Sequence, residues 1–133
     1  MQDPSASRPT SAELDLLRVL WQQGPCTARQ AHELLQRERP EVTEANVLRQ
    51  LQLMHAKGQL SRDESQRAHV YAAVEPRERL QTQLLGDMAR RLFSGSGKQL
   101  ILTALRTQVD AGEREEIARL LSEGLGTPPG DRR

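Results

Sequence analysis

The sequence has little cysteine, few aromatic residues and no long hydrophobic run. Its single cysteine, Cys26, excludes an internal disulfide, which is the usual situation in a reducing cytoplasm. No apolar stretch approaches the roughly 20 residues that a membrane-spanning helix needs, and the N-terminus lacks the apolar segment of a signal peptide. We therefore expect a cytoplasmic protein that has no membrane partner.

Aromatic side chains are scarce, and neither sign of charge is in clear excess. Trp21, Tyr71 and Phe93 are the aromatic residues among 133, so any core must consist mostly of Leu, Val and Ala. With 36% hydrophobic residues such a core is thin, which favours burial of apolar surface between two subunits. The 19 basic residues are balanced by 18 acidic ones, so the net charge of +1 gives no nucleic-acid signal by itself.

Residues typical of catalytic and metal sites are few and dispersed. The histidines His32, His55 and His69 form no closely spaced ligand pair of the kind found in zinc sites. The Ser-Gly-Ser-Gly sequence at 94–97 lacks the strand context of a phosphate-binding loop, so it indicates a turn. We expect no enzymatic activity, no metal and no cofactor. Cys26 precedes a predicted helix, where a thiol pKa can be lowered, so a redox switch is one hypothesis.

The most informative stretch is residues 43–74, whose periodicity changes half-way along. Thr43 can cap a helix, and Gly58 can end it in the left-handed conformation. Two strand candidates follow, at 59–62 and 67–74, separated by the polar turn 63–66. A helix that is followed at once by a polar-tipped hairpin indicates a winged helix, with a recognition helix and a β wing.

Periodicity predicts two faces for the recognition helix. The apolar face is expected to contain Val47, Leu48, Leu51, Met54 and Ala56. The other face is expected to contain Asn46, Arg49, Gln50 and Leu53. For Leu53 we expect inward packing after a small rotation, in preference to contact with a thymine methyl group.

Two capping boxes, Thr10–Glu13 and Thr27–Gln30, predict two helices before this stretch. The first is expected to bury Leu14, Leu17, Val19, Leu20 and Trp21, and the second Ala28, Ala31, Leu34 and Leu35. Residues 37–41 form a loop into the recognition helix. In this order the second and third helices form a helix-turn-helix pair.

The region after Pro76 predicts three amphipathic helices, which have too little apolar surface to form a closed core in one copy. We therefore expect them to pair with the same segment of a second chain. The residues assigned to this homodimer interface are Leu80, Leu84, Leu85, Met88, Leu92, Phe93, Leu100, Ile101, Leu105, Ile117, Leu120 and Leu121.

The expected fold class is mainly α with a small β wing. A winged helix-turn-helix domain at 9–74 is followed by a C-terminal helical dimerisation region at 75–123. Residues 1–8 are expected to be a flexible N-terminus and residues 124–133 a disordered tail.

Nine side chains are candidates for contact with DNA. Asn46, Arg49 and Gln50 have the donors and acceptors that read base edges in the major groove. Thr27, Arg29, Thr43 and Lys57 stand near helix ends, where phosphates bind, although both threonines could be plain caps. Arg62 and Arg67 flank the wing and could reach a phosphate or the minor groove. The alternative for all nine is an ordinary solvated surface.

Several segments carry a family resemblance through their order and spacing. They are 10–21, 27–35, Asn46-Val47 with Lys57-Gly58, 69–71, 92–96, 100–102 and 113–117. From about Pro9 to Glu123 the sequence resembles the penicillinase repressor family of bacterial transcription regulators (BlaI/MecI type). The resemblance implies a homodimeric winged-helix repressor that binds an inverted-repeat operator in double-stranded DNA. It also implies a regulatory protease or sensor protein as a partner, since in the best-known members such a protein triggers repressor cleavage and derepression.

The sequence departs from the family pattern at several positions. Thr103-Ala104 stands at the possible cleavage position, where cleaved members carry Asn-Phe. The C-terminal cysteine motif of the copper-responsive branch is absent. Ala45 and Leu53 occupy recognition-helix positions that are often basic in the family, so base contacts cannot be transferred position by position.

Two other functions compete with the repressor hypothesis. A winged-helix protein–protein interaction module would use the near-neutral surface to bind a protein in place of DNA. A regulator that responds to a small molecule ranks last, because nothing in the sequence marks a ligand pocket.

Overall fold

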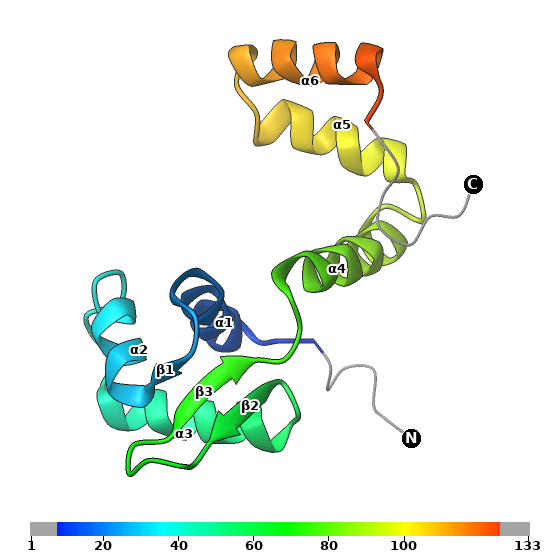
Figure 1. The fold of residues 1–133 in the computed structure, drawn as a ribbon. Coiled ribbons are helices and arrows are strands. Elements are labelled where there is room, and N and C mark those ends of the chain that lie inside the picture. Colours follow the sequence, from blue (N-terminus) through cyan, green and yellow to red (C-terminus); the bar gives the residue numbers. More distant parts are fainter. Residues whose placement is uncertain (1–7, 126–133) are drawn as a thin grey trace. The chain divides into compact units, whose positions relative to one another are not determined.

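The computed structural model describes residues 8–125, and most of the predicted flexible N-terminus and disordered tail lies outside this range. The elements follow in the order α1 (Ser11–Gln23), β1 (Cys26–Thr27), α2 (Ala28–Leu35), α3 (Glu44–Ala56), β2 (Leu60–Asp63), β3 (Val70–Ala73), α4 (Arg77–Leu92), α5 (Gly97–Thr107) and α6 (Ala111–Glu123) (Figure 1). The predicted fold class, mainly α with a small β wing, is confirmed. The chain divides into two compact units, and the boundary lies inside α4. The first unit ends at Leu84, and the second unit begins at Leu85.

Side-chain caps fix where the helices of the first unit begin. Both predicted capping boxes are present: Thr10 and Glu13 exchange hydrogen bonds at the start of α1, and Thr27 and Gln30 do so at the start of α2. Thr43 caps α3 by accepting a hydrogen bond from the Asn46 N–H at 3.1 Å. Each cap satisfies backbone donors that the first helical turn leaves free.

The core of the first unit lies between α1, α2, α3 and the sheet. Its fully buried members are Leu16, Leu17, Val19, Leu20, Cys26, Ala31, Leu35, Val47, Leu51, Met54, Leu60, Tyr71 and Leu80. In α1 the prediction was partly wrong, since Leu16 is buried while Leu14 and Trp21 are half-buried. The buried stripe of α1 runs through positions 13, 16, 17 and 20, and the acidic Glu13 at its start conceals this spacing in the sequence.

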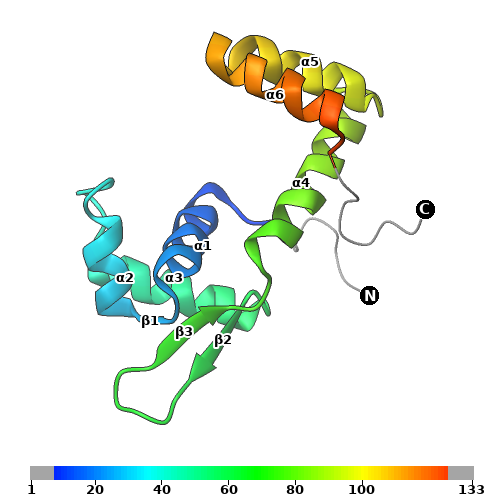
Figure 2. The same ribbon diagram turned by 45° about the horizontal axis from the view of Figure 1, so that its top comes forward.

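The wing belongs to a three-stranded antiparallel sheet with the order β1-β3-β2. The two-residue strand β1 was not predicted; it pairs Cys26 with Tyr71 and Thr27 with Val70. The strand β3 is shorter than the predicted 67–74, because residues 64–69 form the tip of the hairpin. Figure 2 shows this hairpin extending away from the helices of the first unit.

The placement of Cys26 contradicts the redox hypothesis. The thiol is buried, with 4% of the residue exposed, and it donates a hydrogen bond to the carbonyl oxygen of Gly24 at 3.3 Å. Burial raises its pKa, so the reactive thiolate form is disfavoured.

The first turns of α4 belong to the first unit. Leu80 is 6% exposed and packs in the core, and Leu84 is half-buried against it. The indole N–H of Trp21 donates to the carbonyl oxygen of Glu75 at 2.9 Å, which fixes the chain just before α4. The assignment of Leu80 to a subunit interface is therefore wrong, because its side chain is already covered within its own chain.

The second unit has almost no interior of its own. Neither α5 nor α6 contains a buried residue, and the large apolar side chains of Leu85, Met88, Leu92, Ile101, Leu120 and Leu121 are 43% to 74% exposed. Capping still defines the helices, through Ser96 for α5 and Asp110 for α6. Within residues 8–125, no helix is long and apolar enough to cross a membrane.

Candidate nucleic-acid interface

Two consecutive helices and the wing form the candidate interface. Helix α2 ends at Leu35, and a short loop leads to Thr43 and then to α3. Val47, Leu51 and Met54 bury one side of α3 against the core, so its opposite side faces outward. After α3, Gly58 has φ +83, which allows the chain to turn sharply into β2 and the wing.

The outward side of α3 differs from the predicted face by a rotation about the helix axis. Ala56 is exposed and Leu48 is 40% exposed, although both were assigned to the buried face. Leu53 was expected to pack inward, yet it is 52% exposed. Gln50 is half-buried and lines a small recess with Val42 and Val47, away from the centre of the exposed side.

The centre of the exposed side contains Ala45, Arg49 and Gln52, with Asn46 at its edge. Gln52 was not among the predicted DNA contacts. The sequence alone would have placed Gln52 on the exposed side only if the buried face had been centred on Val47, Leu51 and Met54. Including the apolar residues Leu48 and Ala56 in that face shifts its centre toward Gln52.

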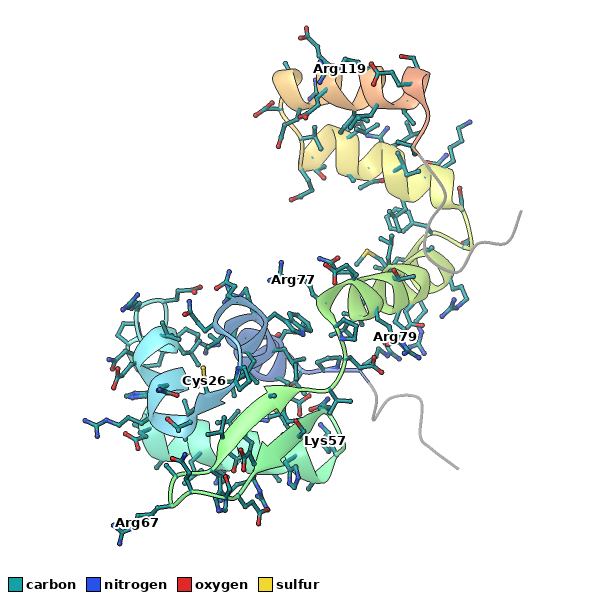
Figure 3. All side chains as sticks on the ribbon, viewed as in Figure 1. Cys26, Lys57, Arg67, Arg77, Arg79 and Arg119 are labelled. Carbon is teal, nitrogen blue, oxygen red and sulfur yellow. The ribbon has the colours of Figure 1, made fainter. Side chains whose placement is uncertain are left out.

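Two of the predicted DNA-contacting arginines have no side-chain partner among the described residues. Within residues 8–125, neither Arg49 nor Arg67 takes part in an ion pair or a side-chain hydrogen bond, and both are exposed. Arg49 lies in the middle of α3, and Arg67 extends outward from the tip of the wing (Figure 3). A guanidinium that has no carboxylate partner keeps its full charge and all its donors for an anionic ligand.

The other two predicted arginines have carboxylate partners. Arg29 lies 3.5 Å from Glu33 in an exposed pair on α2, and such pairs contribute little and open readily. Arg62 lies 2.6 Å from Glu64 in the wing, and this carboxylate is the main reason that the pKa of Arg62 is raised. Arg62 would have to leave Glu64 before it could bind a phosphate.

Lys57, the residue after α3, is held by a buried carboxylate. Its Nζ donates to Glu13 Oε2 at 2.6 Å, and Glu13 is only 2% exposed. The other Glu13 oxygen accepts from the Thr10 N–H at 2.9 Å and from Gln59 Nε2 at 3.3 Å. One carboxylate therefore joins the start of α1, the end of α3 and the residue before β2.

Opposing influences act on the pKa of Glu13. Burial is the largest, and it raises the pKa. The hydrogen bonds from Lys57, Thr10 and Gln59, together with the charge of Lys57, outweigh burial, so the pKa lies below its ordinary value. Glu13 is therefore ionised at neutral pH and acts as an anionic anchor for Lys57.

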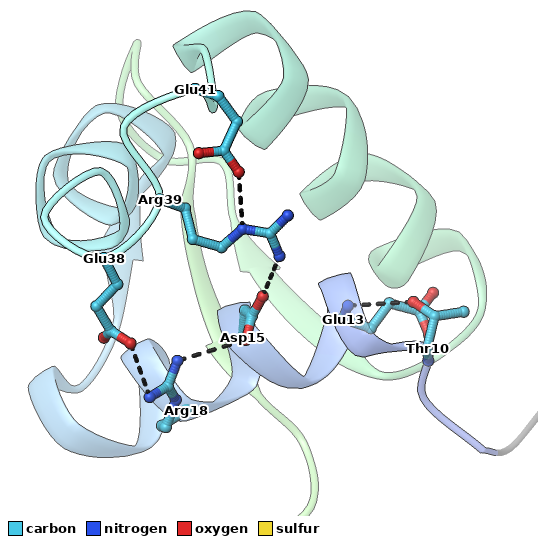
Figure 4. Close-up of polar contacts among 7 residues, drawn as sticks. All are labelled: Thr10, Glu13, Asp15, Arg18, Glu38, Arg39 and Glu41. Atoms are coloured by element: carbon cyan, nitrogen blue, oxygen red, sulfur yellow. Dashed lines mark hydrogen bonds and ion pairs between the residues drawn. The ribbon is translucent and has the colours of Figure 1, made fainter.

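A second polar network links the loop between α2 and α3 to α1 (Figure 4). Asp15 on α1 accepts a hydrogen bond from Arg39 Nη1 at 2.7 Å, and the Arg39 Nε donates to Glu41 at 3.1 Å. Arg18 lies 3.1 Å from Glu38 and 3.4 Å from Asp15. These contacts link the loop to α1, and because the side chains of Arg18, Arg39 and Glu38 are 44% to 57% exposed, each contact contributes little to stability.

The two threonines among the predicted contacts are used as caps. The hydroxyl oxygen of Thr27 accepts from the Gln30 N–H at 3.2 Å, as that of Thr43 does from Asn46. A capping threonine still has its hydroxyl proton, so it can donate to a phosphate at the same time. The cap role is thus present, and it is compatible with the predicted phosphate contact.

A recess of about 440 Å³ separates α3 from the wing. Thr27 and Arg29 come to it from the start of α2, Leu48 and Gln52 from α3, and Arg67 and His69 from the wing. These residues include two cations, Arg29 and Arg67, and one carboxylate, that of Glu44. Residues of α2, α3 and the wing therefore surround one recess, and its cations outnumber its carboxylates.

A helix-turn-helix pair followed by a β hairpin defines the class of winged helix-turn-helix proteins. A family model described as penicillinase repressor matches residues 9–123. The chain therefore belongs to the penicillinase repressor family, whose members are DNA-binding transcriptional repressors and not enzymes. A comparison with curated proteins found no match.

Proposed function

We propose that the protein is a homodimeric transcriptional repressor that inserts one α3 per subunit into successive major grooves of an inverted-repeat operator. The observation that carries this proposal is Arg49, an exposed guanidinium at the centre of the outward side of α3 that has no partner among residues 8–125. In the major groove, such a group can donate two hydrogen bonds to the O6 and N7 atoms of guanine. Asn46 and Gln52 flank it and have the amide groups that pair with adenine.

The wing and the helix ends supply the phosphate contacts in this proposal. Arg67 reaches outward from the hairpin, while Thr27 and Arg29 lie across the recess at the start of α2. Because each of them contacts the backbone and not a base, they position the helix without selecting sequence. Lys57 is occupied by Glu13, so its first role is to fix α3 against α1 and β2.

Dimerisation through the second unit follows from its lack of an interior. Apolar side chains such as Leu92, Ile101 and Leu121 are more than half exposed in a single copy. A second copy would cover them with the same residues, as two-fold symmetric interfaces do. Two weakly charged winged domains then bind one operator at high effective concentration, which raises affinity without any new contact.

Loss of the dimer is accordingly the proposed route to derepression. Thr103 and Ala104, the possible cleavage position, are both half-buried inside α5, and the Thr107 hydroxyl donates to the Thr103 carbonyl at 2.7 Å. A protease would have to unwind this turn before cutting it. A regulatory protease therefore needs a locally opened α5 as its substrate, or the inducer must separate the subunits in another way.

Operator selection followed by quantitative binding tests this proposal. Purified protein is used to capture genomic fragments, and the best-enriched fragment is measured by fluorescence anisotropy at two salt concentrations. We expect a short inverted repeat in promoters, bound by a dimer, with affinity that falls steeply as salt rises because counterions are released. Capture without enrichment over random DNA would contradict the proposal and would favour the protein–protein interaction module.

A further inference from the structure

The first unit contains a groove that the DNA-binding hypothesis does not use. It lies between α1 and the first two turns of α4 and has a volume of about 370 Å³. Leu14 and Trp21 line it from α1, and Leu80 and Leu84 from α4. Volume and apolar lining are both in the range of sites that bind small organic molecules.

The rim of the groove carries a positive charge. Arg18, Arg77 and Asp15 are its ionisable residues. The carboxylate of Asp15 is already engaged by Arg39 at 2.7 Å and by Arg18 at 3.4 Å. Arg77, by contrast, has no ion pair or hydrogen bond within residues 8–125. An occupant therefore meets an apolar floor and one uncompensated guanidinium.

Two residues of the groove floor are held by contacts within the first unit. The Trp21 indole N–H is already bonded to the carbonyl oxygen of Glu75, and Leu80 is part of the buried core. The ring of Trp21 thus offers its apolar surface without a free donor at that nitrogen. A preformed surface of this kind loses little conformational entropy when a ligand binds.

We propose that this groove is a binding site for a small amphipathic anion, namely a molecule with an aromatic or branched aliphatic body and one carboxylate. The apolar body lies against Trp21, Leu80 and Leu84, and the carboxylate pairs with Arg77. The site is separate from the DNA-binding surface of α3 and the wing. Its test therefore does not depend on whether the protein binds DNA.

Trp21 supplies the assay, because it is the single tryptophan of the chain and its indole N–H gives one isolated cross-peak in a ¹⁵N–¹H correlation spectrum. The full chain is titrated with 1-naphthoate and, separately, with the neutral 1-naphthalenemethanol. We expect a saturable shift of the Trp21 cross-peak with 1-naphthoate and a dissociation constant on the order of 1 mM. The neutral alcohol should bind about two- to fivefold more weakly.

A matched pair of variants tests the charge contact. Arg77→Gln removes the unpaired guanidinium, whereas Arg79→Gln removes a neighbouring one that pairs with Glu75 at 3.4 Å and does not line the groove. Figure 3 shows the two arginines leaving the start of α4 in different directions. We expect Arg77→Gln to weaken 1-naphthoate about two- to fivefold and to leave the alcohol unchanged, and Arg79→Gln to alter neither.

Three results would overturn the proposal. The first is the absence of a saturable shift of the Trp21 cross-peak. The second is equal binding of the acid and the alcohol, or equal losses in the two arginine variants. The third is a Trp21 cross-peak that moves as the protein concentration is raised and that no longer responds to 1-naphthoate at high protein concentration. This result would mean that a second copy of the chain occupies the groove.

Discussion

Replacement of Glu13 isolates the contribution of the buried carboxylate that ties α1 to α3 and β2. Glu13→Ala removes the partner of Lys57 and leaves three donors, on Thr10, Lys57 and Gln59, without their acceptor. Removing one partner of a buried ion pair costs about 3–5 kcal/mol of unfolding free energy. The Lys57 side chain is 37% exposed and can turn toward water, so we expect the lower end of this range, about 3 kcal/mol.

Glu13→Gln is the milder change, since it keeps the shape and one acceptor oxygen and removes the charge. We expect a loss of about 1–2 kcal/mol at pH 7, measured by urea unfolding followed by circular dichroism at fixed protein concentration. The matched control is Glu38→Gln. Glu38 also pairs with an arginine of α1, at 3.1 Å, but its side chain is 57% exposed, so we expect a change below about 0.5 kcal/mol.

The contribution of Glu13 to the stability of the fold should be largest at neutral pH and should decrease in acid. The pKa of Glu13 is lower in the folded protein than its ordinary value, so its ionisation stabilises the fold above the unfolded-state pKa of about 4.3. This contribution is lost as the pH falls through the folded-state pKa. The stability difference between the wild type and Glu13→Gln should therefore be full at pH 7 and shrink below about pH 4. Equal stability of Glu13→Gln and Glu38→Gln at pH 7, or a difference that persists undiminished in acid, would refute the reasoning.

The remaining predictions concern DNA binding and assembly. Arg49→Ala should weaken the selected operator by about 1–3 kcal/mol and random DNA far less; equal losses in the anisotropy assay would make Arg49 a phosphate contact. Arg67→Ala should weaken both DNAs alike and lower the slope of log K against log salt by about one, and an unchanged slope would remove Arg67 from the interface. Leu121 is 58% exposed in one copy, and Leu121→Glu would place a charge in the proposed subunit interface. We expect this variant to sediment as a monomer and to lose tight operator binding. Gln108→Glu, at another exposed residue, is the control and should change neither property. Peroxide should leave operator affinity unchanged, because Cys26 is buried and its pKa is raised; a loss that Cys26→Ser prevents would reopen the redox hypothesis.

Local chemistry explains what the sequence could predict. The capping boxes at Thr10 and Thr27 and the stop at Gly58 depend on residues a few positions apart, so the helix boundaries could be inferred from the chain alone. The wing was predictable for the same reason, since a polar turn between two short strand candidates indicates a hairpin. The order of these elements was sufficient for the fold class.

Features that depend on distant partners could not be inferred in this way. Glu13 looks like an ordinary cap residue until Lys57 and Gln59, more than forty positions away, are seen to surround its carboxylate. The strand β1 has only two residues, and it exists because β3 offers it an edge. Leu80 follows a proline boundary and continues an amphipathic stripe, so only the packing of α4 against the core shows which unit contains it.

A small error in the predicted rotation of α3 about its axis had the largest effect on the candidate site. The predicted face of α3 placed Gln50 beside Arg49 and omitted Gln52, because Leu48 was counted as buried. Neighbouring residues on a helix are about 100° apart, so one misassigned side chain is enough to shift the inferred contact face. The central position, Arg49, is exposed on either interpretation, which is why it remains the first residue to test.

The boundary between the two units lies inside a continuous helix, and this makes the length of α4 a quantity that evolution or design can adjust. Each residue inserted near Gly86 would lengthen α4 by about 1.5 Å and turn the helical residues that follow it by about 100° about the helix axis. In a symmetric dimer, such a change would be applied to both subunits at once. In the proposed dimer, the length of α4 would therefore be one determinant of the spacing between two operator half-sites, independently of the bases that α3 reads.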